Sequence, residues 1–209
     1  MRCVLRPVAE QTILITGGTD GLGRALAAEL AAADATLLVH GRDDVRGRET
    51  IDEIHSRTGN ENLHWLRADF ASLDEVRTLA RHATGEHDRL DGPVNNAGIG
   101  ITLPGGDGRM ESSNGYELRF AVNYLAGYLL TRLVLPLLED SKMVLTSGIN
   151  PTSSLQDGVR ATLRLVADPE LDGMTGRYFN GLRPAEPHRQ AHDLEARRQL
   201  RELSDRLCF

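Results

Sequence analysis

Lysine is almost missing from this sequence of 209 residues. Lys142 is the only one, so arginine supplies nearly all of the positive charge, and the net charge is −6. Proteins that bind nucleic acid gather lysine and arginine on one surface, because contacts with phosphate drive that binding. The acidic balance therefore argues against a nucleic-acid partner. Lys142 is also the only residue that could serve any chemistry that needs a lysine ammonium group.

Cysteine and long apolar runs are scarce too. Cys3 and Cys208 stand at opposite ends of the chain, which fits neither a disulfide framework nor a metal motif. The first residues lack the apolar core and cleavage site of a signal peptide, and no apolar run approaches the roughly 18 residues of a membrane span. The length fits one domain. We expect a single domain over residues 1–209 in the reducing cytoplasm, with no membrane span and no metal.

Strand-like and helix-like segments alternate along the chain. Short apolar runs predict strands, and longer segments rich in alanine, leucine or charge predict helices. The expected strands are 12–16, 35–39, 63–66, 93–96 and 143–146, and the expected helices between them are 22–33, 44–57, 72–82 and 115–138. This order predicts a parallel sheet with helices on both faces. Ser72 and Glu75 have the capping-box spacing that begins a helix.

A glycine-rich motif follows the first strand. Residues 16–23 read Thr-Gly-Gly-Thr-Asp-Gly-Leu-Gly and lead directly into the first expected helix. Glycine lets the backbone turn tightly and approach a pyrophosphate, and the following helix N-terminus offers N–H groups and a positive dipole to the phosphates. In this context the motif predicts a dinucleotide site. A glycine-rich turn without a ligand is the alternative.

The end of the second strand indicates which nucleotide the site takes. Sites for NAD usually place an acid there to bind the ribose 2′-hydroxyl, whereas here the matching position is Gly41, followed by Arg42. A guanidinium suits a 2′-phosphate, and Arg24 after the glycine motif is a possible second contact. The pattern favours NADP over NAD. The alternative is a solvated surface pair of Arg42 with Asp43.

The glycine motif and five later landmarks resemble the short-chain dehydrogenase/reductase family, in the family's order. The later landmarks are Asp69 after the third strand, Asn-Asn-Ala-Gly at 95–98, Asn123 in the long helix, Ser147 after the fifth strand, and 175–179 near the C-terminus. The resemblance implies an α/β fold with a Rossmann-like doubly wound parallel sheet in the order 3-2-1-4-5, and a late C-terminal strand.

The resemblance also implies an activity, which is hydride transfer between NADP(H) and a small alcohol, ketone or aldehyde. It assigns Ser147 and Asn123 to the active site. It assigns cofactor binding to nine residues, which are Thr16, Gly17, Gly21, Leu22, Gly23, Asp69, Asn95, Ala97 and Gly98, and Asp69 matches the family's acid that binds the adenine amine. Arg42 at the strand tip joins them as the candidate contact for the 2′-phosphate.

The catalytic pair of the family is missing. The family uses a tyrosine as general acid and base, with a lysine four residues later that lowers the tyrosine pKa. No tyrosine here has lysine at that spacing; Tyr128 has Arg132 instead, on the helix that carries Asn123. We expect an internal deletion with its junction at 148–151, or an error in the sequence. The alternative functions are a non-catalytic nucleotide-binding remnant and an interaction protein.

Such a deletion would remove one strand and one helix from the family's fold. Helix 153–167 is long enough for a crossover between parallel neighbours, so we expect the strand at 177–180 to pair directly with 143–146. We also expect the long helix to lose cover over Leu125, Leu129 and Leu133 and to cause self-association. The charged helix at 192–207 is expected to be a solvated face.

Overall fold

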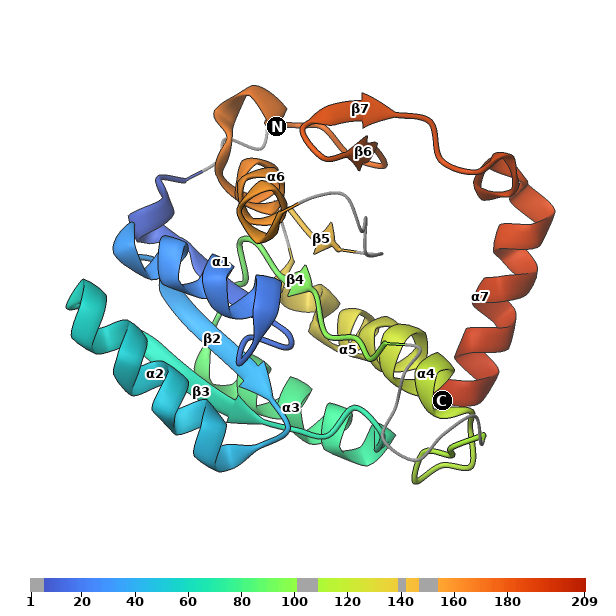
Figure 1. The fold of residues 1–209 in the computed structure, drawn as a ribbon. Coiled ribbons are helices and arrows are strands. Elements are labelled where there is room, and N and C mark those ends of the chain that lie inside the picture. The colour runs from blue at the N-terminus through green and yellow to red at the C-terminus, as the bar shows by residue number, and fades with distance from the viewer. Residues whose placement is uncertain (1–5, 101–108, 139–141, 147–153) are drawn as a thin grey trace.

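A five-stranded parallel sheet forms the centre of the protein, in the order β3-β2-β1-β4-β5 (Figure 1). The computed structural model describes residues 6–100, 109–138, 142–146 and 154–209. The strands are β1 (Thr12–Ile15), β2 (Thr36–Gly41), β3 (Leu63–Arg67), β4 (Val94–Asn95) and β5 (Val144–Leu145). The doubly wound parallel sheet and its predicted strand order are confirmed.

Helices cover both faces of the sheet. One face carries α1 (Gly21–Ala32), α2 (Asp44–Thr58) and α6 (Leu155–Ala167), and the other carries α3 (Leu73–Glu86) and the long helix. Successive residues of β1 alternate between two apolar cores: Ile13 and Ile15 pack with α1, and Leu14 packs toward α3. Burial on both faces explains why the strands are continuous apolar runs.

The long helix is continuous from Leu118 to Leu137 but changes its winding three times. It consists of α4 (Leu118–Phe120), the π-helical η2 (Ala121–Leu125), α5 (Ala126–Val134) and the 3-10 turn η3 (Leu135–Leu137). Its length and apolar composition would suffice to cross a membrane, contrary to our expectation from the sequence. The core helix of a globular domain has the same features, and Leu125 and Leu129 are fully buried in the core.

The C-terminal helix α7 (Leu194–Cys208) packs against the long helix (Figure 1). Three tyrosine hydroxyls reach it: Tyr116 donates to Leu207 O, Tyr124 lies 2.8 Å from Ser204 Oγ, and Tyr128 donates to Asp205. The expectation of a wholly solvated α7 was therefore wrong. So was the expectation of an uncovered Leu125 and Leu129; Leu133 is half-buried.

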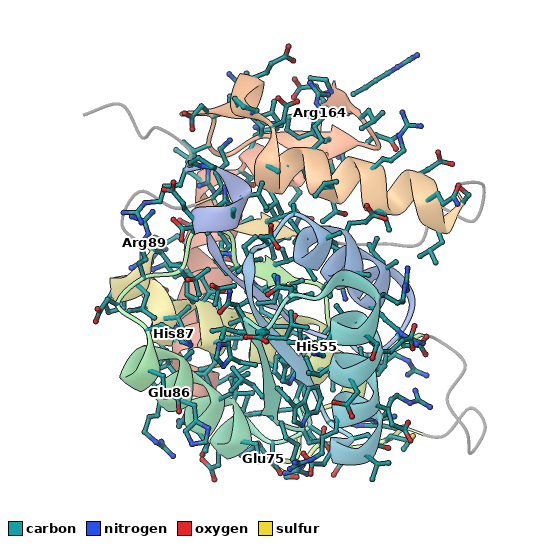
Figure 2. All side chains as sticks on the ribbon, turned by 90° about the vertical axis from the view of Figure 1, so that its left-hand side faces the viewer. His55, Glu75, Glu86, His87, Arg89 and Arg164 are labelled. Carbon is teal, nitrogen blue, oxygen red and sulfur yellow. The ribbon has the colours of Figure 1, made fainter. Side chains whose placement is uncertain are left out.

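The late C-terminal strand lies outside the sheet. β6 (Tyr178–Asn180) pairs antiparallel with β7 (Arg183–Ala185) in a two-stranded hairpin. The predicted pairing with β5 is therefore wrong. α6 instead packs across α1, and Arg164 of α6 donates to Leu182 O in the hairpin turn (Figure 2). A local turn at Gly181, with φ 58°, brings the two short strands together without any crossover.

Three 3-10 turns complete the described elements: η1 (Val8–Glu10), η4 (Pro169–Leu171) and η5 (Arg189–His192). Ser147 and the expected junction at 148–151 lie outside the residues that the structure describes.

Candidate nucleotide-binding site

The predicted cofactor residues meet at the carboxyl edge of the sheet. Thr16 follows β1, Arg42 follows β2, Asp69 lies just after β3, and Asn95 ends β4. Because parallel strands end at the same edge, residues 80 positions apart come together there, as the hydrogen bond from Asn96 to Thr16 shows. Doubly wound sheets bind ligands at this edge, where the strand order reverses around the first strand.

The glycine turn has a shape that only glycine allows. Gly17 and Gly21 have φ angles of 67° and 49°. At Gly23 a Cβ atom would lie 2.3 Å from Gly17 O, and at Gly17 it would lie 2.9 Å from Ala97 Cα. The start of α1 therefore packs directly on the turn, and the turn packs on the segment after β4.

Thr16 and Asn96 clamp the turn to that segment. Thr16 Oγ1 donates to Val94 O and accepts hydrogen bonds of 2.9 Å from the N–H groups of Asn96 and Ala97. Asn96 Nδ2 in return donates to Thr16 O and Gly17 O. This reciprocal set satisfies buried backbone groups on both sides and makes one rigid unit of the two loops.

The N-terminus of α1 is the candidate phosphate-binding feature of the site. Asp20 caps it by accepting from Gly21 N at 2.7 Å. The N–H groups of Leu22 and Gly23 belong to the first helical turn, which has no intrahelical acceptors, and they carry the positive end of the helix dipole. This arrangement suits a pyrophosphate group. Leu22 also packs on Gly158 of α6.

A polar hollow of about 340 Å³ lies between α1 and α2, beside the glycine turn, and is lined by both arginines and carboxylates. Arg24, the possible second phosphate contact, forms an ion pair with Glu53. Arg46 lies 3.7 Å from Asp20 across the hollow. Arg42 is exposed at the tip of β2, directly before α2. Arg42 is thus placed as the sequence predicts, whereas Arg24 is already engaged by a carboxylate.

Trp65 on β3 supports this corner and was not identified from the sequence. A Cβ atom at Gly41 would lie 2.8 Å from the Trp65 ring, and at Gly47 it would lie 2.2 Å away. The indole N–H donates to Asp44 at 2.7 Å, which helps to lower the pKa of Asp44. Gly41 therefore has a packing role besides removing an acid from the strand tip.

Asp69 is held in place by hydrogen bonds with its neighbours. Its carboxylate accepts from Ala71 N at 2.9 Å, and its own N–H donates to Glu75 in the first turn of α3 (Figure 2). Ser72 accepts from Glu75 N as the cap of α3, but the Glu75 carboxylate bonds Asp69 and Arg67 rather than Ser72. Only one of the two hydrogen bonds of the predicted capping box is therefore present, from Glu75 N to Ser72. The Glu75 carboxylate instead holds the backbone of Asp69.

His40 is a second residue that sequence reasoning missed. It lies next to the end of β2 with a relative exposure of 3%. Its Nδ1 accepts from Gly17 N at 3.3 Å, and its Nε2 lies 3.0 Å from Ala68 O. Burial lowers the pKa of His40 to about 4. The only signal in the sequence was a polar residue inside an apolar strand.

Asn123 and Asn95 lie at the other end of the site. Asn123, in the π-helical turn, accepts from Ile99 N at 2.7 Å and donates to Ile99 O. Gly98 lies against the Asn123 side chain. Asn95 donates to Thr131 of α5, so it joins β4 to the long helix. π-helical turns of this kind are frequent at functional sites.

Tyr128 and Arg132 do not form a substitute for the missing pair. Tyr128 donates its hydroxyl hydrogen bond to Asp205 at 2.7 Å and accepts one from Arg132 at 2.9 Å. Burial, followed by the bond to Asp205, raises the pKa of Tyr128, whereas a catalytic tyrosine needs a lowered pKa. The pair locks α7 to the long helix. Within the part of the chain that the structure describes, no three metal-ligating side chains gather.

Together the sheet order, the glycine turn and the helix terminus define a nucleotide-binding α/β protein. The family model "short chain dehydrogenase" matches residues 11–148. The chain therefore belongs to the short-chain dehydrogenase/reductase family, whose members are oxidoreductases.

Similar proteins agree with this assignment. Mouse polyprenol dehydrogenase is 37% identical over 138 residues, which are 66% of this chain and 40% of that protein. Human retinol dehydrogenase 14 is 36% identical over 144 residues, which are 63% of this chain and 41% of that protein. The chain thus spans less than half the length of these two relatives.

Solved structures match at the level of the fold. A metagenomic short-chain oxidoreductase in complex with NADP superposes with a TM-score of 0.57 at 25% identity, over 71% of this chain and 67% of that one. A short chain dehydrogenase from Escherichia coli CFT073, complexed with NADPH, has a TM-score of 0.57 at 25% identity, over 78% of this chain and 73% of that one.

Proposed function

We propose that this protein binds NADP(H) and transfers hydride between it and an alcohol or carbonyl substrate, at a strongly impaired rate. The observation that carries the proposal is the rigid turn at Gly17, Gly21 and Gly23, beside a helix N-terminus that has N–H groups for a pyrophosphate. The preference for NADP rests on Arg42 at the tip of β2, next to Gly41 in the place where NAD sites usually have an acid.

The impairment follows from the missing acid. Asn123 stands beside the cofactor edge, and Ser147 follows β5 in the sequence, but no tyrosine has a lysine four residues later. Hydride transfer to a carbonyl needs a proton for the developing alkoxide, and loss of general acid catalysis costs about 10²–10⁴-fold in rate. The bound cofactor would supply the hydride, and Ser147 would orient the substrate oxygen. Asn123, whose amide is bonded to Ile99, would hold the loop after β4 beside the site.

The experiment measures binding and turnover separately. Purified protein is titrated with NADPH and NADH by fluorescence, and NADPH oxidation is then followed with ketones, aldehydes and retinal, with polyprenol and retinol in the reverse direction. The names of the two mammalian relatives motivate the last three compounds. We expect saturable NADPH binding with turnover several decades below that of an intact family member.

Two outcomes contradict the proposal in different ways. Failure to bind NADPH would show that the proposed nucleotide site does not exist. Turnover equal to that of an intact relative, abolished by Ser147→Ala, would show that another residue supplies the proton. Binding without measurable turnover would favour the alternative of a non-catalytic nucleotide-binding protein.

A further inference from the structure

His40 occupies a position where a polar ring is costly unless both nitrogens are paired. It follows Leu37, Leu38 and Val39, which are fully buried, and is itself almost inaccessible. A buried polar group without hydrogen bonds costs free energy. Here each ring nitrogen faces a backbone group, Gly17 N–H at Nδ1 and Ala68 O at Nε2. The His40 ring is therefore buried with both of its nitrogens hydrogen-bonded.

These two partners define the state of the imidazole. Gly17 N–H is a donor, so Nδ1 must accept, and Ala68 O is an acceptor, so Nε2 must carry the proton. Burial favours the neutral form and keeps the pKa near 4, although the neighbouring Asp69 acts in the opposite direction. Stacking on Phe70, with ring centroids 4.3 Å apart, holds the ring plane. The neutral Nε2–H tautomer is the only one that satisfies both neighbours.

The partners also lie on the two sides of the candidate cofactor site. Gly17 is the first glycine of the phosphate turn, and Ala68 directly precedes Asp69, the expected adenine contact. The backbone ladders stop at Ile15–Val39 and Gly41–Arg67, so the ring extends the connection between β1, β2 and β3 to the loops.

The amides of the turn are engaged by the same residue. Gly17 N–H donates to the His40 ring, and Gly18 N–H donates to His40 O at 2.8 Å. Neither amide points to a ligand. His40 therefore fixes the peptide planes at Gly17 and Gly18, and the first turn of α1 presents its N–H groups to the phosphates.

We propose that His40 is a positioning residue for the dinucleotide, which sets the phosphate turn and the adenine side of the site in register through its two ring nitrogens. The inference rests on the proposed NADP(H) site. It assigns His40 no contact with the nucleotide. Its prediction is that changes at His40 weaken NADPH binding in a protein that remains folded.

The test compares three variants with the wild type. His40→Phe keeps an aromatic ring against Phe70 but removes both hydrogen bonds. His40→Asn keeps a short acceptor toward Gly17. Leu79→Ala, on the buried face of α3 and away from the turn, is the matched control for general loss of stability, because Leu79 is 1% exposed. NADPH dissociation constants and melting temperatures are measured for each variant at a temperature where all are folded.

We expect His40→Phe, which removes both ring hydrogen bonds, to raise the NADPH dissociation constant by about tenfold. His40→Asn should recover part of that affinity, and Leu79→Ala should lower the melting temperature without changing the affinity. In the wild type, ¹⁵N shifts of the His40 ring should show the neutral Nε2–H tautomer.

Three results would overturn the inference. They are unchanged NADPH affinity in folded His40→Phe, an equal loss of affinity in Leu79→Ala, and a protonated or Nδ1–H ring in the wild type. A wild-type protein that binds no NADPH would instead overturn the proposed function, on which the inference depends. The two failures are therefore distinguished by the wild-type titration.

Discussion

Arg42 is the side chain on which nucleotide preference depends. It is exposed directly after β2, whereas Arg24, the other candidate phosphate contact, is held by Glu53. We expect Arg42→Ala to weaken NADPH binding roughly 10–150-fold, since charge-assisted hydrogen bonds contribute about 1.5–3 kcal/mol. NADH binding should change little, because NADH has no 2′-phosphate. Fluorescence titration of both nucleotides checks this.

The control for Arg42 is Arg48→Ala, which removes the same charge from the next turn of α2. Arg48 pairs with Asp44 at 3.1 Å and is well exposed. Equal losses for NADPH and NADH, or an equal effect of Arg48→Ala, would show that Arg42 does not meet the 2′-phosphate.

Gly23 and Gly85 make a matched pair of helical glycines with opposite expectations. A Cβ atom at Gly23 would overlap Gly17 O and Asn96 Nδ2, whereas at Gly85 it would meet nothing within 4 Å. We expect Gly23→Ala to cost about 1–3 kcal/mol of folding free energy and to abolish NADPH binding. Gly85→Ala should stabilise α3 by about 0.4–1 kcal/mol. Urea denaturation measures both; a harmless Gly23→Ala would contradict the packing of α1 on the turn.

The sequence predicted those site residues whose roles depend only on their neighbours in the chain. The φ angles at Gly17 and Gly21 and the end of β2 at Gly41 follow from a turn and a strand tip that can be read within a few residues. His40 and Trp65 were not predictable in this way. Their partners lie 20 to 30 positions away, as for His40 with Gly17 and Ala68, so the contacts exist only once the strands are in register.

At the scale of elements, the long helix and α7 are joined through tyrosine hydroxyls. Tyr128→Phe removes a hydroxyl that donates to Asp205 and accepts from Arg132. We expect a loss of roughly 1 kcal/mol, which lowers the melting temperature by about 2–4 °C. Any residual NADPH oxidation should be unchanged, because Tyr128 is a structural residue.

The matched control is Tyr178→Phe in β6, whose ring is largely exposed. It should leave the melting temperature unchanged. If Tyr128→Phe abolished turnover without lowering stability, Tyr128 would be a catalytic acid and the structural assignment would be wrong. Scanning calorimetry and the NADPH oxidation assay are sufficient to decide.

Elements with signals at their own ends were predicted well, and those that depend on distant partners were not. Ser154 and Asp157 cap α6 reciprocally, and Ser72 caps α3, so both helices begin close to the expected residue. The strand at 178–180 was predicted correctly as a strand but paired incorrectly. Its true partner, Arg183–Ala185, is adjacent in sequence and has no apolar alternation that would predict a strand.

At the scale of the whole molecule, α7 covers part of the long helix that the expected deletion was predicted to leave exposed. The parallel sheet followed from the β-α-β pattern, and its strand order followed from the family resemblance. The amphipathic pattern did not indicate that α7 covers the middle of the long helix. Exposed apolar residues remain at the ends of the helix: Phe120 is 36% exposed and Leu135 is 55% exposed. We propose that these ends, rather than Leu125 and Leu129, mediate any self-association.

Self-association should therefore depend on Leu135 and be reversed by charge. Exposed apolar side chains on a helix lose contact with water when two copies meet, whereas an ammonium group there would have to be desolvated. We expect the wild type to elute earlier at higher concentration in a size-exclusion dilution series and to bind ANS, and Leu135→Lys to reduce both. Leu194→Lys is the matched control, because Leu194 is 75% exposed at the distant start of α7. A monomer at every concentration, or equal effects of the two lysine substitutions, would rule out this helix as the interface.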